Sequence, residues 1–181
     1  MLTEFTFHQL TAHIASQGHA MAGATIAASA ALACSLGEAC VRINAPLLPG
    51  GEAGRVAGRL AEIRDQLQAL TDEDGAAITA FAALRAAGKT LEGQERLCQM
   101  PIEMAWLAIE AACLLQEFRS LIQVAQDDLE MAVTLLAGTT RAATLLLDSN
   151  LRIWPDPPLL ARFEPELAWL KEQIEQVQPK L

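Results

Sequence analysis

The chain has 181 residues, of which 52% are hydrophobic, and it carries a net charge of −9. This length predicts one domain with a sizeable core, because two domains would leave little room for a core in each. Lysine and arginine form no block in this acidic chain, which excludes a nucleic-acid-binding protein that relies on a basic face. Alanine and leucine dominate and tyrosine is absent, so the composition favours helices over strands.

Cysteine spacing and the first basic residue bear on the compartment. The four cysteines form no C-x-x-C pair, so we expect free thiols, as in the reducing cytoplasm. No lysine or arginine precedes Arg42, whereas a signal peptide begins with a basic region. Residues 20–41 are long enough to span a membrane, but alanine, serine and glycine make them weakly apolar. We therefore expect a cytoplasmic protein without a membrane span, in which this segment is a central helix.

Hydrophobic spacing and helix-stop signals predict the first two helices. Residues 3–16 place apolar side chains at helical spacing, with Thr3 as the N-cap and Gly18 as the stop. Residues 23–43 form the second helix, whose alanines allow other helices to approach closely on every side. We therefore place this helix in the centre of the fold or in a subunit interface.

Two long helices follow the clearest loop of the chain, residues 44–54, which contains two prolines and three glycines. Residues 53–87 form the third helix, which Gly88 ends. Residues 91–125 form the fourth helix, and Pro101 inside it kinks the helix or marks a restart.

The last part of the chain contains two more helices, separated by a proline-rich break. Asp127 or Asp128 caps the fifth helix, which ends near Asn150. Residues 159–177 form an amphipathic last helix with Pro165 in its first turn.

These elements predict an all-α fold, an up-and-down bundle of long helices with an alanine-rich central helix and an appended C-terminal helix. No repeat of fixed period is visible, so we expect one domain over residues 1–181. Its core covers about residues 3–151, and its C-terminal appendage covers about residues 155–181.

Three stretches resemble ligand motifs but are incomplete. The sequence GKT at residues 88–90 lacks the earlier glycine of a P-loop and follows a helix, where a strand is required. His8 and His13 lie about 140° apart on a helix, so they do not share a face. The acidic stretch at residues 72–75 lacks the remaining ligands of a calcium loop. We therefore expect no metal site and no required cofactor.

Asp74 is the residue of this acidic stretch that is best placed for chemistry. Mostly apolar residues follow it at positions 76–81, and a carboxylate at the edge of an apolar wall can have a raised pKa and act in acid–base chemistry. A solvated acidic face is the alternative interpretation. Helix capping likewise explains Asp128, and a helix C-terminus explains Asn150.

Five landmarks follow one another between residues 3 and 151. They are HAMAGAT at 19–25 before the alanine-rich run, DEDGAAI at 72–78, MPIEMA at 100–105, DLEMA at 128–132, and a helix with Arg141 and Asn150. In order and spacing they resemble the cyclodeaminase/cyclohydrolase family, which includes the cyclodeaminase domain of formiminotransferase-cyclodeaminase and bacterial methenyltetrahydrofolate cyclohydrolases. The corresponding family patterns are P-x-P-G-G-G-S, D-x-D-A-x-A-F, V-P-L-E-V-A, S-D-V-x-V-A and N-V-x-x-N.

The resemblance implies a role in folate one-carbon metabolism, as a formiminotetrahydrofolate cyclodeaminase or a methenyltetrahydrofolate cyclohydrolase. Both reactions pass through a tetrahedral carbon between two nitrogens, and a carboxylate serves both proton transfer and stabilisation of the cationic amidine-like group. By resemblance, Asp74 is this catalytic carboxylate, and a tetrahydrofolate derivative is the substrate or ligand. The family also implies a homodimer, which fits the excess of apolar surface on the alanine-rich and leucine-rich helices.

The resemblance also implies a ligand site around this carboxylate. Gly23 and Thr25 approach the ligand at the N-terminus of the second helix, where the helix dipole favours acceptor groups. Asp128 holds the pterin or assists proton transfer, Asn150 donates a hydrogen bond, and Arg141 meets a folate glutamate.

Three departures from the family patterns leave the activity open. Ala22 and Ala24 add side chains where the family has glycines, and Leu146 replaces the first asparagine of N-V-x-x-N. The chain is therefore interpreted as an active cyclodeaminase or cyclohydrolase, or as a non-catalytic ligand-binding or regulatory relative on the same dimeric fold. A purely structural helical bundle is the third interpretation.

Overall fold

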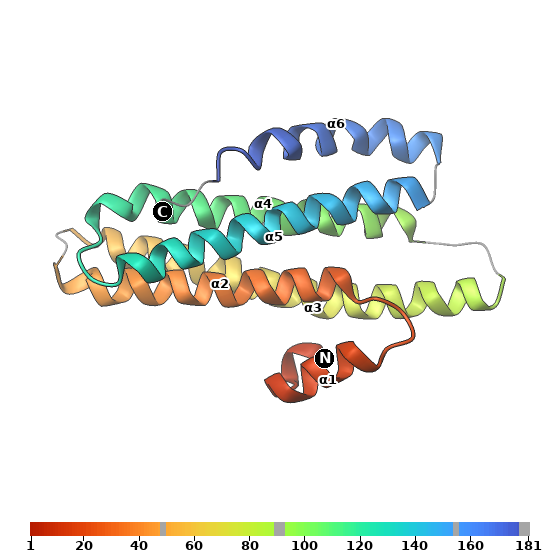
Figure 1. The fold of residues 1–181 in the computed structure, drawn as a ribbon, viewed down its shortest axis with the longest axis horizontal. Coiled ribbons are helices and arrows are strands. Elements are labelled where there is room, and N and C mark those ends of the chain that lie inside the picture. Colours follow the sequence, from red (N-terminus) through yellow and green to blue (C-terminus); the bar gives the residue numbers. More distant parts are fainter. Residues whose placement is uncertain (48–49, 89–92, 154–155, 178–181) are drawn as a thin grey trace.

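Helices are the only regular secondary structure in the parts of the chain that the computed structural model describes, residues 1–47, 50–88, 93–153 and 156–177 (Figure 1). In chain order the elements are η1 (Leu2–Glu4), α1 (Phe7–Ser16), α2 (Ala22–Asn44), η2 (Ala45–Leu47), α3 (Glu52–Ala86), α4 (Gln94–Phe118), η3 (Arg119–Leu121), α5 (Gln126–Ile153) and α6 (Pro157–Gln173).

Helices α2 to α5 form an up-and-down bundle in which α2 packs on α3 and α5, and α4 packs on α5 and α3. The appended α6 lies against α4 and α5, whereas α1 stands beside the bundle (Figure 1). The expected all-α bundle with an appended C-terminal helix is confirmed. Its core contains fully buried side chains from all four long helices: Val41, Leu60, Ile63, Leu67, Met104, Leu115, Leu136 and Leu147.

Helix α2 lies at the centre of the bundle because its small residues let other helices approach. Four of its alanines are completely buried, and a Cβ at Gly37 would lie 2.6 Å from the Leu115 side chain. The segments Ala22–Leu47 and Gln94–Leu121 are long and apolar enough to cross a membrane, but 56% and 67% of their most apolar windows are buried inside the bundle. Burial of this kind is typical of core helices.

The N-terminal segment differs from the single helix expected over residues 3–16. The η1 turn comes first, and α1 begins after Thr6, which caps it in a capping box with Gln9. Thr3 does not cap this helix, because its N–H and hydroxyl donate instead to the Asp72 carboxylate of α3, at 3.0 and 2.5 Å. Since α1 buries no residue, this contact is one of the few that hold the segment to the bundle.

Helix α4 ends at Phe118, earlier than expected. After η3 the chain turns sharply, and Ala125 has a φ of 62°. The buried Asn44 at the end of α2 fixes this turn, because its amide oxygen accepts from the N–H groups of Gln123 and Val124 and its amide nitrogen donates to the Val124 carbonyl. A contact between residues so far apart leaves no periodic pattern in the sequence. The apolar residues of the turn therefore look, in the sequence, like a continuation of the fourth helix.

Two prolines lie inside helices, and the structure excludes a helix restart at the first and the expected first-turn position of the second. α4 continues through Pro101 without a restart. α6 begins at Pro157 rather than at residue 159, so Pro165 lies in the interior of α6 and not in its first turn. A proline is tolerated at the first helical position because its missing N–H would have no partner there. The predicted start of the fourth helix and most of the GKT stretch lie outside the described residues.

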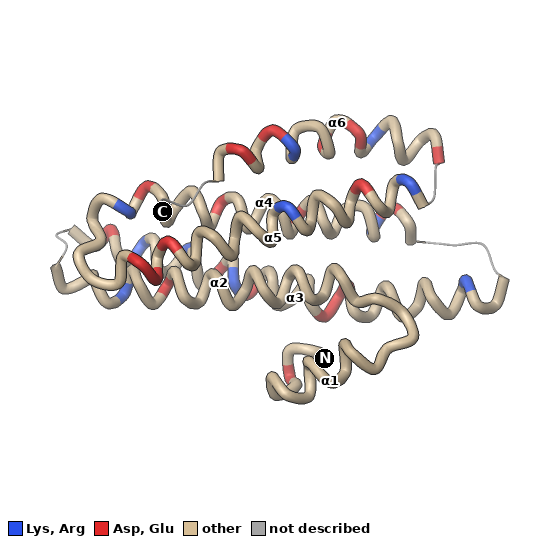
Figure 2. The backbone as a smooth tube through the Cα atoms, in the orientation of Figure 1, with Lys and Arg blue, Asp and Glu red and all other residues tan. Residues whose placement is uncertain are grey.

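Charged residues are distributed unevenly along the bundle (Figure 2). Residues 5–37, which include α1 and more than half of α2, contain no Asp, Glu, Lys or Arg. The buried Glu38 follows this stretch and forms ion pairs with Arg42 and Arg64, at 2.6 and 2.7 Å. The four cysteines are free, as expected, and burial raises the pKa of Cys34 to about 12, so this thiol stays protonated.

Candidate functional site

Asp74 lies on α3, where its side chain faces the first turn of α2. It is 5% exposed, and its Oδ2 accepts a hydrogen bond of 2.7 Å from the backbone N–H of Ala24. The first N–H groups of a helix have no partner within the helix, and Met21 at the N-cap makes no side-chain capping bond. Asp74 therefore caps α2 from the neighbouring helix, at the end where the helix dipole favours a carboxylate.

Gly23 makes this approach possible. A Cβ at Gly23 would lie 2.1 Å from the Asp74 Oδ1, which is far inside van der Waals contact. The glycine is buried and its φ is negative, so close approach rather than an unusual backbone angle requires it. The sequence analysis expects the backbone at Gly23 to contact a ligand. In the structure the Asp74 carboxylate lies against it instead.

Burial is the largest influence on the Asp74 carboxyl group, and it raises the pKa above the ordinary value. The hydrogen bond from Ala24 opposes this rise because it favours the charged form, and the negative charge of Glu73 adds a smaller rise. A carboxyl group with a raised pKa serves more readily as a general acid. Asp74 thus has the environment predicted from the apolar residues that follow it.

Asn150, near the end of α5, compensates for a gap in the hydrogen bonding of α4. Pro101 has no N–H, so the carbonyl of Leu97 one turn earlier lacks its helical donor. The Asn150 Nδ2 donates a hydrogen bond of 2.7 Å to this carbonyl. α4 therefore continues through the proline, and the amide of Asn150 is fixed while its oxygen keeps its capacity to accept hydrogen bonds.

Asp74 and Asn150 line the same small cavity, which has a volume of about 40 Å³. A cavity of this size holds about one or two water molecules. A buried carboxyl and an amide that line one cavity from separate helices make this cavity the candidate for an acid–base site. The cavity wall combines residues from all four bundle helices and the segment before α2: Ala20, Ala22, Gly23, Asp74, Ile78, Leu97, Leu146 and Asn150.

Two predicted site residues lie on the outside of α2 and α5. Thr25 is exposed; its hydroxyl donates to the Met21 carbonyl at 2.8 Å, and the residue lines a groove between α1 and α2. Arg141 is exposed midway along α5. Neither lines the small cavity that Asp74 lines, although Thr25 directly follows Ala24, whose N–H binds Asp74.

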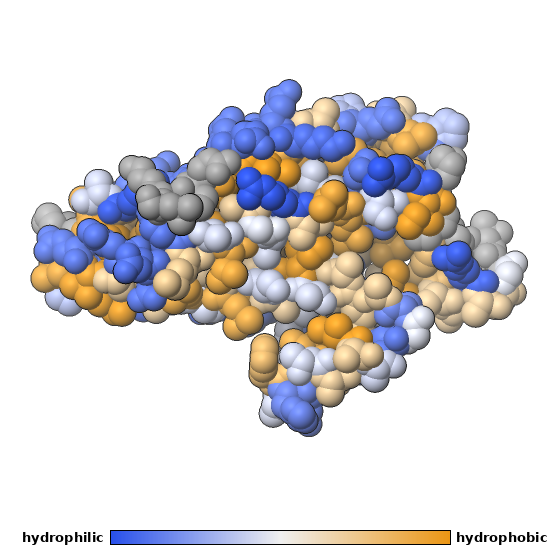
Figure 3. Space-filling model, in the orientation of Figure 1, coloured by the Kyte–Doolittle hydropathy of each residue, from blue (hydrophilic) through white to orange (hydrophobic). Residues whose placement is uncertain are grey.

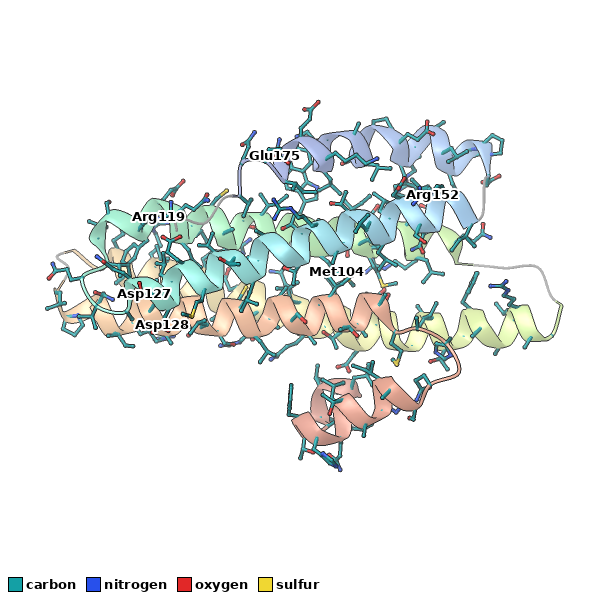
Figure 4. The ribbon with its side chains drawn as sticks, in the orientation of Figure 1. Met104, Arg119, Asp127, Asp128, Arg152 and Glu175 are labelled. Carbon is teal, nitrogen blue, oxygen red and sulfur yellow. The ribbon has the colours of Figure 1, made fainter. Side chains whose placement is uncertain are left out.

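Asp128 lies at the opposite end of the bundle from Asp74. α5 begins at Gln126, so Asp127 and Asp128 belong to its first turn and neither is the N-cap that was expected. Figure 4 shows both at the end of the bundle where α2 finishes. Asp74 contacts Ala24 and the charge of Asp128 acts on Cys40. The 16 residues between these two positions of α2 are roughly 24 Å long, and a ligand touching both carboxylates of one chain would have to span about that distance.

Sequence reasoning misses the groups that complete the arrangement around Asp74. They are the backbone N–H of Ala24, the carbonyl of Leu97, and Pro101, which deprives that carbonyl of its donor. Pro101 is visible in the sequence, but its relation to Asn150 is a contact between two helices and has no local signal. Among the described residues, no group of three His, Cys, Asp or Glu side chains could hold a metal ion.

A family model matches the sequence of this chain, and a solved structure shares its fold. The sequence model of the formiminotransferase-cyclodeaminase family matches residues 6–168. The chain belongs to this family. The match to the formiminotransferase-cyclodeaminase family runs from the N-cap of α1 into α6, so it includes Asp74 and Asn150.

A solved member shows the same fold. The crystal structure of formiminotetrahydrofolate cyclodeaminase from Thermotoga maritima is similar to this chain with a TM-score of 0.82 and 18% sequence identity, covering 98% of this chain and 93% of that one. At this identity the likeness establishes the fold of the family over nearly the whole chain. No curated protein matches the chain by sequence.

Proposed function

We propose that the protein binds a reduced folate carrying a one-carbon unit and acts on it as a formiminotetrahydrofolate cyclodeaminase or a methenyltetrahydrofolate cyclohydrolase. The family and the solved cyclodeaminase with this fold support the folate class of ligand. The observation that carries the proposal is the buried Asp74 carboxyl group, whose pKa is raised and which shares a cavity with the Asn150 amide. The reaction needs no cofactor, and the protein works in the cytoplasm.

Asp74 supplies the proton transfer that either reaction needs. In the cyclodeaminase reaction N10 of the folate attacks the formimino carbon, and the Asp74 carboxylic acid protonates the nitrogen that leaves as ammonia. The remaining carboxylate takes up the proton that N10 loses and stabilises the cationic amidine-like product. In the cyclohydrolase reaction the carboxylate takes a proton from the water that attacks the methenyl carbon. The resulting carboxylic acid gives this proton to the ring nitrogen as its bond to that carbon breaks, and the new hydroxyl group loses its proton to solvent and becomes the formyl carbonyl. The Asn150 oxygen accepts a hydrogen bond from the substrate and so orients it beside Asp74.

Substrate entry requires the cavity to open, because 40 Å³ is far below the roughly 300 Å³ of small-molecule sites. The N-terminal segment is the part best able to move, since α1 buries no residue. Leu2 of this segment lies over Gly75, where a Cβ would be 2.5 Å from its side chain, and the Met21 methyl group lies beside it. Ala20, in the segment between α1 and α2, lines the cavity, so displacement of α1 with that segment widens the cavity from this side.

The small cavity and Leu146 favour a second candidate function, a non-catalytic relative that binds a ligand or regulates a partner. Leu146 places an apolar side chain in the cavity wall beside Asp74. A site that lacks one polar partner binds a polar substrate less well, by about 1–3 kcal/mol.

Two substrates separate these functions. We would titrate the protein with 5,10-methenyltetrahydrofolate, following binding and loss of absorbance, and measure ammonia release from 5-formiminotetrahydrofolate. Turnover that disappears in Asp74→Asn but persists in Asp65→Asn, which removes an exposed acid from the same helix, supports the enzyme. Binding without turnover supports the non-catalytic relative. The absence of both binding and turnover would contradict both functions and would leave only the interpretation as a structural bundle.

We also propose that the protein is a homodimer in which a second copy covers the outer sides of α2 and α5. Figure 3 shows hydrophobic residues gathered over these two helices, which pack side by side. The charge-free stretch of residues 5–37 includes more than half of α2, so close approach of an identical surface brings no like charges together there. Exposed large hydrophobic residues on the two helices are Leu32, Ile43, Met131, Leu135, Leu145 and Ile153.

A further inference from the structure

The groove that Thr25 lines has a volume of about 430 Å³ and lies between the N-terminal segment and helices α2 and α3. It shares no lining residue with the small cavity at Asp74, so the chemistry proposed for Asp74 does not use it. Its volume falls within the roughly 300–1,000 Å³ of small-molecule sites. The surface proposed for a second copy covers α2 and α5 instead, and the two surfaces share Leu32.

This groove is uncharged, although the chain carries a net charge of −9. Among the described residues, no Asp, Glu, Lys, Arg or His lines it. Asp72 follows the lining residue Thr71, but its carboxylate already accepts from the N–H and the hydroxyl of Thr3. An ionised group that moved from water into the groove would lose hydration without gaining a charged partner. The groove therefore favours an uncharged ligand.

The hydroxyl groups along the groove already donate their protons within the chain. Five of them donate to a backbone carbonyl one turn earlier, and the sixth donates to Asp72. Each hydroxyl oxygen still accepts hydrogen bonds, so this set favours a ligand that donates one. Gln68 also lines the groove, but its amide both donates and accepts and so does not select. The six hydroxyl groups belong to Thr3, Thr11, Thr25, Ser29, Ser35 and Thr71.

The apolar walls of the groove suit a chain of methylene groups. Phe7 on one side is 72% exposed and Leu32 on the other is 60% exposed, so both gain burial when a ligand fills the groove. Ala28 and Ala31 of α2 leave room between these larger side chains. Since α1 buries no residue, it is free to adjust its position to the ligand.

We propose that this groove binds a free, uncharged aliphatic molecule with a hydroxyl group at one end. The chain lies between the large side chains of α1 and the alanines of α2, and the hydroxyl donates to a serine or threonine oxygen of the groove. This ligand has no ring and no charge, so it differs in class from the folate proposed for Asp74. The inference does not depend on the function proposed there.

The probe is 1-octanol, titrated into the full chain by calorimetry. We expect a dissociation constant on the order of 1 mM or tighter for a ligand of this size. Octanoate and octylammonium have the same chain length but carry a negative or a positive charge, and both should bind at least about tenfold more weakly. Heptyl methyl ether is an isomer of octanol without a donor, and it should bind about threefold more weakly or worse.

Substitutions on both walls locate the binding site. Ala28→Phe fills the groove from α2 and should weaken binding of 1-octanol at least about tenfold. Ala39→Phe is the matched control, since it adds the same ring at an exposed position of α2 that does not line the groove, and binding should be unchanged. Phe7→Ala removes an exposed wall residue and should weaken binding about threefold or more. Circular dichroism checks that each variant keeps its helix content.

Four outcomes overturn the proposal. They are no binding of 1-octanol at millimolar concentration, equal binding of octanoate or octylammonium, equal binding of the ether, and unchanged binding in both Ala28→Phe and Phe7→Ala. Sedimentation equilibrium separates a further occupant, a second copy of the chain. If Ala28→Phe lowers the mass from two chains to one and 1-octanol does not bind the parent protein, the second copy fills the groove and the ligand does not.

Discussion

Asp74 and Asn150 are held in place by backbone groups of other helices. Asp74 accepts from the Ala24 N–H, and Asn150 donates to the Leu97 carbonyl, so each side chain joins two helices. Backbone partners cannot rotate away as side chains do, so the orientation of both polar groups is set by how the helices pack. A change in helix packing therefore alters the site directly.

The raised pKa of Asp74 predicts how stability depends on pH. The folded chain holds this proton more tightly than the unfolded chain, so ionisation of Asp74 destabilises the fold. As pH rises from about 4, the ordinary carboxyl value, through the raised folded pKa, the free energy of unfolding falls relative to Asp74→Asn, which cannot ionise. Urea unfolding of both proteins across this range measures the difference, and parallel curves would contradict the prediction.

Gly23→Ala should destabilise the fold, because its Cβ would lie 2.1 Å from the Asp74 carboxylate and would separate it from Ala24. Loss of this buried hydrogen bond costs about 1–3 kcal/mol. Gly58→Ala is the matched control, since it lies inside α3 with no atom within 4 Å of the added Cβ. The control should be stabilised by about 0.5–1 kcal/mol, and equal effects in the two variants would argue against the close contact.

Pro101 and Asn150 should be energetically coupled. Asn150→Ala leaves the Leu97 carbonyl without a donor, at a cost of about 1–3 kcal/mol. In a Pro101→Ala background the restored N–H supplies that donor, so the same substitution should cost at least 1 kcal/mol or so less. A double-mutant cycle by urea unfolding measures the coupling, and additive effects would show that the two residues act independently.

Most of the helices follow from hydrophobic spacing, but their ends and contacts depend on other parts of the chain. The alanine-rich run and the apolar series in α3 predict both helices to within a residue or two of the observed ends. Thr3 has the properties of a cap, yet it binds Asp72, and Thr6 takes the capping position. Asp74 is predictable from the apolar residues after it, whereas its partner Ala24 is not, because a backbone N–H has no sequence signature.

Helix α1 should be the least protected of the described helices, since it buries no residue and is attached partly through Thr3 and Asp72. Hydrogen exchange followed by mass spectrometry should show its amides exchanging faster than those of α2. Asp72→Ala should speed this exchange further, while Asp65→Ala should not. Protection of α1 equal to that of α2 would mean that another surface covers it.

At the scale of the whole molecule, the bundle leaves apolar side chains of α2 and α5 in contact with solvent. Leu135→Asp should weaken dimerisation by at least about tenfold, because a buried unpaired charge at an interface is costly. Leu121→Asp changes an exposed leucine of η3 and serves as the control. Sedimentation equilibrium gives the masses, and a parent protein with the mass of one chain would contradict the proposal.

The hydrogen bond that α4 lacks at Pro101 also limits the order in which substitutions can occur during evolution. An amide at position 150 is compatible with either proline or another residue at position 101. Proline at position 101 without that amide leaves the buried Leu97 carbonyl without a hydrogen-bond donor. The asparagine must therefore be acquired before the proline and lost after it. Among relatives, the two positions should change in that order, and chains with proline but no donor at the second position should be rare.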